Sequence, residues 1–260
     1  MEGSEAVVCA RAILGAMLIV SELGVGKRVE HLQLMLGYLV SSKTLNGIPN
    51  KWPGRYPRIN RLRPALRRHP ALLNLIHFNT DNRMRLAADL IRLHELAGPD
   101  LHGFQLNIAW PSIGDLEMYR EAMGPEPRLV LQIGARAMRE LGDSPLRVAE
   151  MTGHYVSLVD DILIDASGGS GEPFVIETGR AYLRAIAERG WNIGLGIAGG
   201  LSSKNVKEQL GPLLEEFPLL SNDAEGRLRT KPEDTLDLFE TASYIAKSVE
   251  ARLPAGMKVE

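Results

Sequence analysis

The sequence contains a single cysteine, Cys9, among its 260 residues. One thiol excludes an intramolecular disulfide and a cysteine-based metal cluster, and it fits a reducing compartment. The formal net charge is only −2, so the global balance indicates neither nucleic acid nor an acidic membrane as a partner. No stretch approaches the roughly 20 apolar residues of a membrane span. The apolar run at 6–20 follows two glutamates and contains Arg11, unlike a signal peptide. We therefore expect a cytoplasmic protein.

Several motifs of cofactor and metal chemistry are also missing. The six histidines are scattered and form no H-x-x-x-H or H-x-H pair, so we expect no metal site. No G-x-G-x-x-G segment opens a strand–turn–helix unit, so no nicotinamide cofactor is indicated. No G-x-S-x-G nucleophile motif is present either. We expect the protein to work without a cofactor.

Apolar strands alternate with helices along the whole chain. The predicted strands end near residues 21, 41, 79, 107, 134, 165, 199 and 223. Strands and helices that alternate at this spacing indicate parallel βαβ units. Eight such units, in a chain close to the roughly 250 residues of a typical (β/α)8 barrel, favour a closed fold over an open sheet. We predict a single-domain α/β protein over 1–260, an eight-stranded parallel (β/α)8 TIM barrel.

Two consecutive strands run into glycine-rich turns, DILIDASGGSG at 161–171 and IGLGIAGGLSS at 193–203. Glycine lets backbone N–H groups approach an anion closely, and a following helix adds positive charge. Two such turns in tandem predict one phosphate held between two loops. The alternative is that the glycines only make tight barrel corners. The predicted phosphate ligands are Gly168, Gly169, Ser170, Gly171, Gly199, Gly200 and Ser202.

Polar residues at other strand ends are candidates for the ligand-binding mouth of the barrel. His77 ends one strand, Gln105 and Asn107 end the next, and Gln132 alternates with apolar residues in the following one. The three amides could bind a ligand without titrating, or they could serve as packing groups. His77 could be a ligand-binding group or a hydrogen-bonded histidine of the barrel. Asp165 follows an apolar strand, so we expect it to point into the mouth; its alternative role is helix capping.

The loop at 43–58, KTLNGIPNKWPGRYPR, is longer than most loops in compact domains. It carries Arg55, Tyr56 and Arg58, which could close over an anionic substrate with Trp52 as an aromatic lid. A solvated surface loop is the competing interpretation.

The motifs LIDASGGSG (163–171) and GIAGGLSSKNV (196–206) resemble the C-terminal half of phosphoribosylanthranilate isomerase. The family has LLD and a GG-x-G loop, then AGGL-x-x-x-NV on the next strand. QLN at 105–107 resembles its Gln-Leu-His-Gly. The resemblance implies Asp165 as general acid in an aldose–ketose, Amadori-type isomerisation of tryptophan biosynthesis. The family's base, a cysteine ending the first strand, is absent, and Glu22 could replace it.

The resulting functional prediction is a cofactor-free isomerase-like barrel that binds a small phosphorylated metabolite, with Asp165 and Glu22 as catalytic residues. Two alternatives stay open: a phosphosugar lyase or isomerase with another substrate, and a non-catalytic phosphometabolite-binding barrel. We expect neither nucleic acid nor membrane as a partner. Barrels of this kind can form homo-oligomers, although no exposed apolar stripe is legible.

Overall fold

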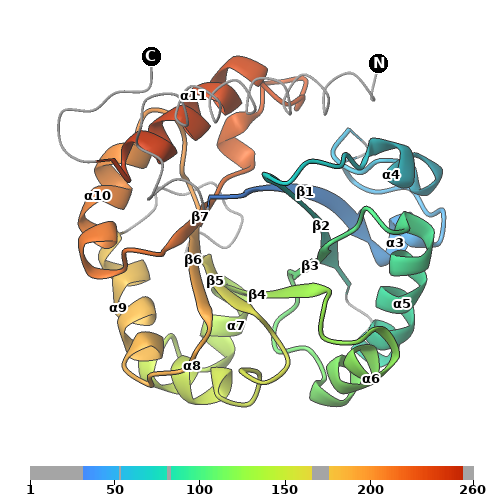
Figure 1. Cartoon of the computed structure of the whole chain (residues 1–260), viewed down its shortest axis with the longest axis horizontal. Coiled ribbons are helices and arrows are strands. Elements are labelled where there is room, and N and C mark those ends of the chain that lie inside the picture. Colours follow the sequence, from blue (N-terminus) through green and yellow to red (C-terminus); the bar gives the residue numbers. More distant parts are fainter. Residues whose placement is uncertain (1–31, 53, 81–82, 166–175, 254–260) are drawn as a thin grey trace.

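A computed structural model of the chain describes residues 32–52, 54–80, 83–165 and 176–253. Seven strands form one parallel sheet in the order of the sequence. The sheet curls, and the helices cover its outer face (Figure 1). The strands are β1 (Leu34–Ser41), β2 (Leu72–Asn79), β3 (Gly103–Leu106), β4 (Arg128–Gly134), β5 (Asp161–Asp165), β6 (Gly194–Ala198) and β7 (Ser221–Asp223).

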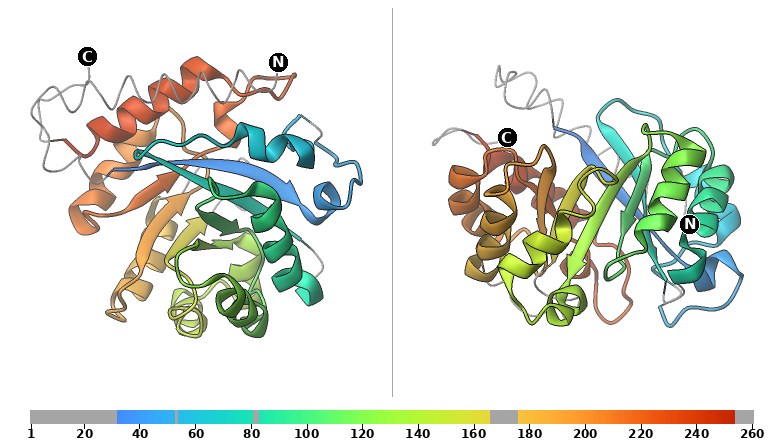
Figure 2. Two further views of the ribbon diagram at one scale, coloured as in Figure 1. Left: turned by 45° about the vertical axis from the view of Figure 1, so that its right-hand side comes forward. Right: turned by 90° about the horizontal axis from the view of Figure 1, so that it is seen from below.

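The helices alternate with these strands, as two further views show (Figure 2). Among the described residues, none of them is long and apolar enough to cross a membrane. They are α3 (Ser42–Leu45), α4 (Ile59–Ala65), α5 (Leu86–Ala97), α6 (Ile113–Met123), α7 (Ala135–Glu140), α8 (Pro145–Thr152), α9 (Ile176–Ala187), α10 (Val206–Glu216) and α11 (Leu238–Glu250), with 3-10 turns η1 (Arg83–Arg85) and η2 (Gly226–Leu228).

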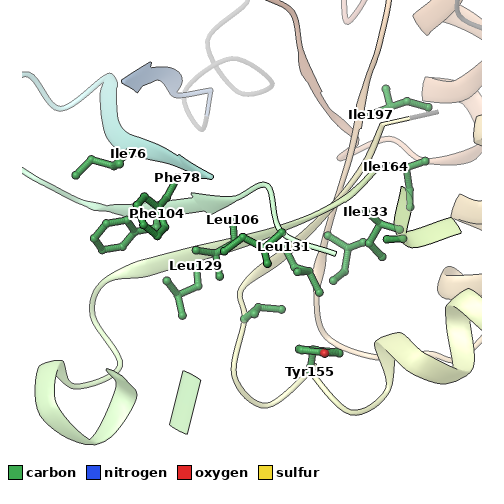
Figure 3. Close-up of a cluster of buried hydrophobic side chains, with 14 of the residues drawn as sticks. Ile76, Phe78, Phe104, Leu106, Leu129, Leu131, Ile133, Tyr155, Ile164 and Ile197 are labelled. Atoms are coloured by element: carbon green, nitrogen blue, oxygen red, sulfur yellow. The ribbon is translucent and has the colours of Figure 1, made fainter. Parts of the chain in front are cut away.

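Two apolar layers follow from the alternation of side chains along each strand. Residues on the outer face, such as Phe78, Leu131 and Ile164, pack under the helices in one continuous cluster (Figure 3). Residues on the inner face form a smaller cluster of Leu75, Val130, Leu163 and Ala198. In β2 to β6 both faces are therefore largely buried, which explains why these strands read as nearly continuous apolar runs.

The predicted α/β class and the parallel sheet are confirmed, but the closed eight-stranded barrel is not. The strand expected at 15–21 lies outside the described residues, so the eighth strand stays a prediction. The final helix begins at Leu238, because the side chain of Asp237 accepts a hydrogen bond from the Glu240 N–H and caps it there.

Candidate functional site

Four polar side chains form a hydrogen-bonded chain at the carboxyl-terminal ends of the strands, hereafter the carboxyl edge. Nε2 of Gln132 donates to the Asp165 carboxylate at 2.9 Å. Nε2 of Gln105 donates to Oε1 of Gln132 at 3.0 Å and to the Asp223 carboxylate at 3.2 Å. This polar chain, Asp165–Gln132–Gln105–Asp223, connects β3, β4, β5 and β7. It lies on the inner face, because Gln132 and Asp165 follow Val130 and Leu163 by two residues.

The amide orientations in this polar chain are set by their partners. Gln105 directs both hydrogens of its amide nitrogen at oxygen atoms, one of which belongs to the Asp223 carboxylate. Rotating that amide would place its oxygen against two other acceptors, which is repulsive. Gln132 is bonded at both ends of its amide. The two amides thus hold both carboxylates as hydrogen-bond acceptors.

One buried atom of the polar chain has no hydrogen-bond partner among the described residues, Oε1 of Gln105. The side chain is fully buried. A buried acceptor without a donor costs about 1–3 kcal/mol. The strands that surround Gln105 therefore hold a polar group at a stability cost, which is more typical of a functional site than of a packing position.

A cavity of about 230 Å³ adjoins the polar chain through Gln132. Asn79, Asn107 and Arg136 also line it, so it offers amide groups and one cation. Trp110, in the loop after β3, has a left-handed φ of 47°. Its indole N–H donates to the carbonyl of Ala137, another residue of the cavity wall, at 3.0 Å. A non-glycine residue in that conformation is strained, and such strain often accompanies ligand sites.

A larger cavity of about 640 Å³ lies at the opposite, amino-terminal ends of β4 to β6. Its charged groups are already paired, Arg120 with Asp160 and Arg128 with Asp161. In parallel α/β sheets, ligands bind at the carboxyl-terminal ends of the strands. We therefore assign the candidate site to the smaller cavity and its polar chain.

The structure brings several of the predicted site residues together. Gln105, Gln132 and Asp165 belong to the polar chain, and Asn107 lines the adjoining cavity. His77 is half-buried and pairs in register with Gln105 on the neighbouring strand. Their roles toward a ligand stay predictions. Asp223 and Arg136 were missed by sequence reasoning; Asp223 could have been noticed as a carboxylate at the end of the last predicted strand.

The predicted phosphate loops are described only in part. Glu22, Gly168, Gly169, Ser170 and Gly171 lie outside the described residues. Gly199 and Gly200 have left-handed φ values of 108° and 63°, which few other residues adopt.

The hydroxyls that follow these glycines already have partners within the chain. Ser202 donates its N–H and its hydroxyl to Asn205, at 2.8 and 3.3 Å. Ser203 donates both groups to the Glu240 carboxylate, at 2.7 and 2.8 Å. A phosphate held by Ser202 would therefore have to replace or share these contacts.

Arg55 forms ion pairs within the protein. Its guanidinium donates to both carboxylate oxygens of Asp234, at 2.6 and 2.8 Å, and to Glu225 at 3.3 Å. It also lies 5.4 Å from the ring centre of Trp52, which is half exposed. The side-chain hydrogen bond from Arg55 is the main cause that lowers the pKa of Asp234. Contact of Arg55 with a substrate stays a prediction, and it would compete with these pairs.

Among the described residues, no group of three His, Cys, Asp or Glu side chains is arranged to hold a metal ion. Comparison with known proteins adds little. No family model and no curated protein matches the sequence. A solved structure described as the "Putative Copper Homeostasis Protein CutC" from Streptococcus agalactiae is similar with a TM-score of 0.45 and 16% identity, over 74% of this chain and 98% of that one. Similarity at this level transfers no activity.

The predicted membership of the phosphoribosylanthranilate isomerase family was wrong. Neither the family models nor the curated proteins support it, and the structural match is to a protein of another name. The aldose–ketose isomerisation of tryptophan biosynthesis, which rested on that resemblance, is withdrawn with it. The physical reason is that glycine-rich turns after parallel strands are a general solution to tight corners and anion approach, so they do not specify one reaction.

Proposed function

We propose that the carboxyl edge binds a small polar molecule, and that Asp165 exchanges a proton with it. The observation that carries this proposal is the polar chain itself. The carboxylates of Asp165 and Asp223 lie at one end of a parallel sheet, where Gln132 donates a hydrogen bond to the first and Gln105 to the second. A cavity lined by further amides lies beside them. The carboxyl ends of strands are where barrel-like folds bind their ligands.

Each residue has a distinct role in this proposal. Asp165 is the acid–base group, because its carboxylate is largely buried and is oriented by the N–H of Gln132. Asp223 accepts hydrogen bonds from the ligand, and Asn79 and Asn107 orient it from the cavity wall. Gln105 is fully buried; it is a positioning residue that joins Gln132 to Asp223.

Binding is tested by thermal shift and calorimetry with paired probes: ribose and ribose 5-phosphate, glycerol and glycerol 3-phosphate. We expect at least one probe to bind wild type, and Asp223→Asn to weaken that binding about tenfold, since a bond to a charged group is worth about 1.5–3 kcal/mol. The phosphorylated member of each pair reveals whether the ligand carries an anion. Asp143→Asn, at an exposed position, is the matched control.

Proton exchange is measured in D2O by NMR on ribose and ribose 5-phosphate, because the aldehyde of their open-chain form activates the C2 proton, which glycerol lacks. Asp165→Asn should keep binding within about threefold but lose deuterium incorporation at carbon, because an amide keeps the shape of the carboxylate and cannot take up a proton. Unchanged incorporation in this variant would remove Asp165 from the proton-transfer role. Absence of binding by all four probes would overturn the site.

A further inference from the structure

The smaller cavity, beside the polar chain, has a single charged side chain in its wall. Of the described residues that line it, Arg136 alone carries a charge, and the other polar side chains are neutral. The nearby carboxylates of Asp165 and Asp223 belong to the polar chain and not to this wall. The cavity therefore combines one cation with amide groups, which are the donors that bind an anionic group.

The guanidinium of Arg136 can bind a ligand at little cost to the fold. Its Nε pairs with Oε1 of Glu140 at 3.2 Å, one turn along α7, and the two side chains are 66% and 39% exposed. Exposed pairs of this spacing contribute little to stability, so a ligand can replace the pair. The two terminal nitrogens bond to no residue in the described part of the chain. They can hold both oxygens of a carboxylate through parallel hydrogen bonds.

Gly134 leaves open space in the same wall. It follows Gln132 by two residues at the end of β4, so it faces the interior of the sheet. Its φ of −89° is accessible to any residue, and a Cβ added there would meet no atom within 4 Å. Neither the backbone nor the packing therefore requires a glycine at this position. A side chain would occupy the cavity, which indicates that the space serves a ligand.

We propose that the ligand of the carboxyl edge is a short hydroxy carboxylic acid, and that Arg136 holds its carboxylate. This inference rests on the proposed function and adds the chemical class of the ligand. The carboxylates of Asp165 and Asp223 repel an anion, so the acid group lies at Arg136 and the hydroxyl groups face the polar chain. The amides of the wall suit hydroxyl groups, because both kinds of group donate and accept hydrogen bonds.

The size and charge of the cavity restrict the ligand further. Its volume of about 230 Å³ is the room of about seven liquid waters at about 30 Å³ each, which fits an acid of only a few carbon atoms. One guanidinium balances the single charge of a carboxylate, whereas a phosphate group carries up to about two charges at pH 7. The cavity therefore favours a carboxylate over a phosphate.

The test is an NMR titration of the full chain with glycerate, its uncharged amide glyceramide, and glycerol 3-phosphate. Glycerate and glyceramide share a shape and differ in charge. Wild type should bind glycerate about tenfold more tightly, because a hydrogen bond between charged groups is about twice as strong as a neutral one. Arg136→Gln should remove this preference and change glyceramide binding less than about threefold. Arg139→Gln, at an exposed position of the same helix, is the matched control and should keep the preference.

A second variant tests the location of the ligand. Gly134→Leu should weaken glycerate binding about tenfold or more, and circular dichroism should show that it stays folded; unchanged binding would place the ligand outside the cavity and overturn the proposal. Equal binding of glycerate and glyceramide by wild type, an unchanged preference in Arg136→Gln, or tighter binding of glycerol 3-phosphate than of glycerate would also overturn it.

These failures can be distinguished from failure of the proposed function. If ribose or glycerol binds and Asp223→Asn weakens that binding, the polar chain still forms a ligand site, and only the carboxylate at Arg136 is refuted. If no neutral or anionic probe binds, the site and the carboxylate are refuted together.

Discussion

Replacing Gln132 by methionine should cost far more stability than replacing Gln105 by methionine, although the two side chains are neighbours in one polar chain. Gln132 is bonded at both ends of its amide. Gln132→Met removes one neutral hydrogen bond, worth about 1 kcal/mol, and one to a carboxylate, worth about 1.5–3 kcal/mol. Apolar burial of methionine returns part of this, so we expect a loss of about 2–3 kcal/mol.

Gln105→Met removes two similar bonds but also removes a buried oxygen that has no partner among the described residues. Losing that oxygen recovers about 1–3 kcal/mol, which offsets a similar cost at Oε1 of Gln132, whose donor is removed. Asp223 is only half-buried, so water can replace its lost donor. We expect a net cost below about 1 kcal/mol.

The measurement is urea denaturation of both variants with an unchanged m-value. The double variant should cost less than the sum of the single ones, because the two residues share a bond. If Gln105→Met is as costly as Gln132→Met, the Gln105 oxygen has a donor and the reasoning fails.

Three further predictions concern stability. Arg55→Gln should lower the unfolding free energy by about 1 kcal/mol at pH 7, as expected for a bidentate pair that is partly exposed. Because the folded-state pKa of Asp234 is lowered, this difference is present above about pH 4 and should vanish as pH falls through that lowered pKa, which denaturation at pH 7 and pH 3 would reveal. Gly103→Ala should cost more than about 3 kcal/mol or prevent folding, because its Cβ would lie 1.9 Å from the backbone oxygen of Arg128; a thermal midpoint close to wild type would contradict this. Burial lowers the pKa of His94, so wild-type stability should fall as pH drops below about 6.5, and His94→Gln should flatten that dependence.

The positions of the central strands were predictable from the sequence because β2 to β6 are largely buried on both faces. Such strands read as apolar runs that stop at a polar residue or glycine. The seven described strands end within one residue of the predicted ends, from Ser41 in β1 to Asp223 in β7. Helix starts were less predictable, because they depend on local caps. Helix α10 begins only at Val206, since Asn205 and Glu240 hold Ser202 and Ser203 in a turn before it.

Three members of the polar chain, Gln105, Gln132 and Asp165, were visible in the sequence, but Asp223 and the pairing of the four were not. Gln105 and Gln132 stand out as amides at positions that alternate with apolar residues. That Gln105 reaches Asp223, 118 residues later, depends on the curvature of the sheet. A period-two pattern says which face a side chain occupies and nothing about which strands face each other across the interior.

The partners of Arg55 could not be predicted from the sequence either, and they explain how the two ends of the sheet are joined. β1 and β7 are the two ends of the described sheet and do not pair with each other. Arg55 follows β1, and its partners Glu225 and Asp234 follow β7. These ion pairs therefore join the two ends of the sheet at the carboxyl edge. When only the sequence is considered, a basic residue in a long loop suggests an anionic substrate. In the folded chain, the nearest anions to Arg55 are the carboxylates of Glu225 and Asp234. The ion pairs of Arg55 with these two residues keep Asp223 on the same side of the interior as Gln105.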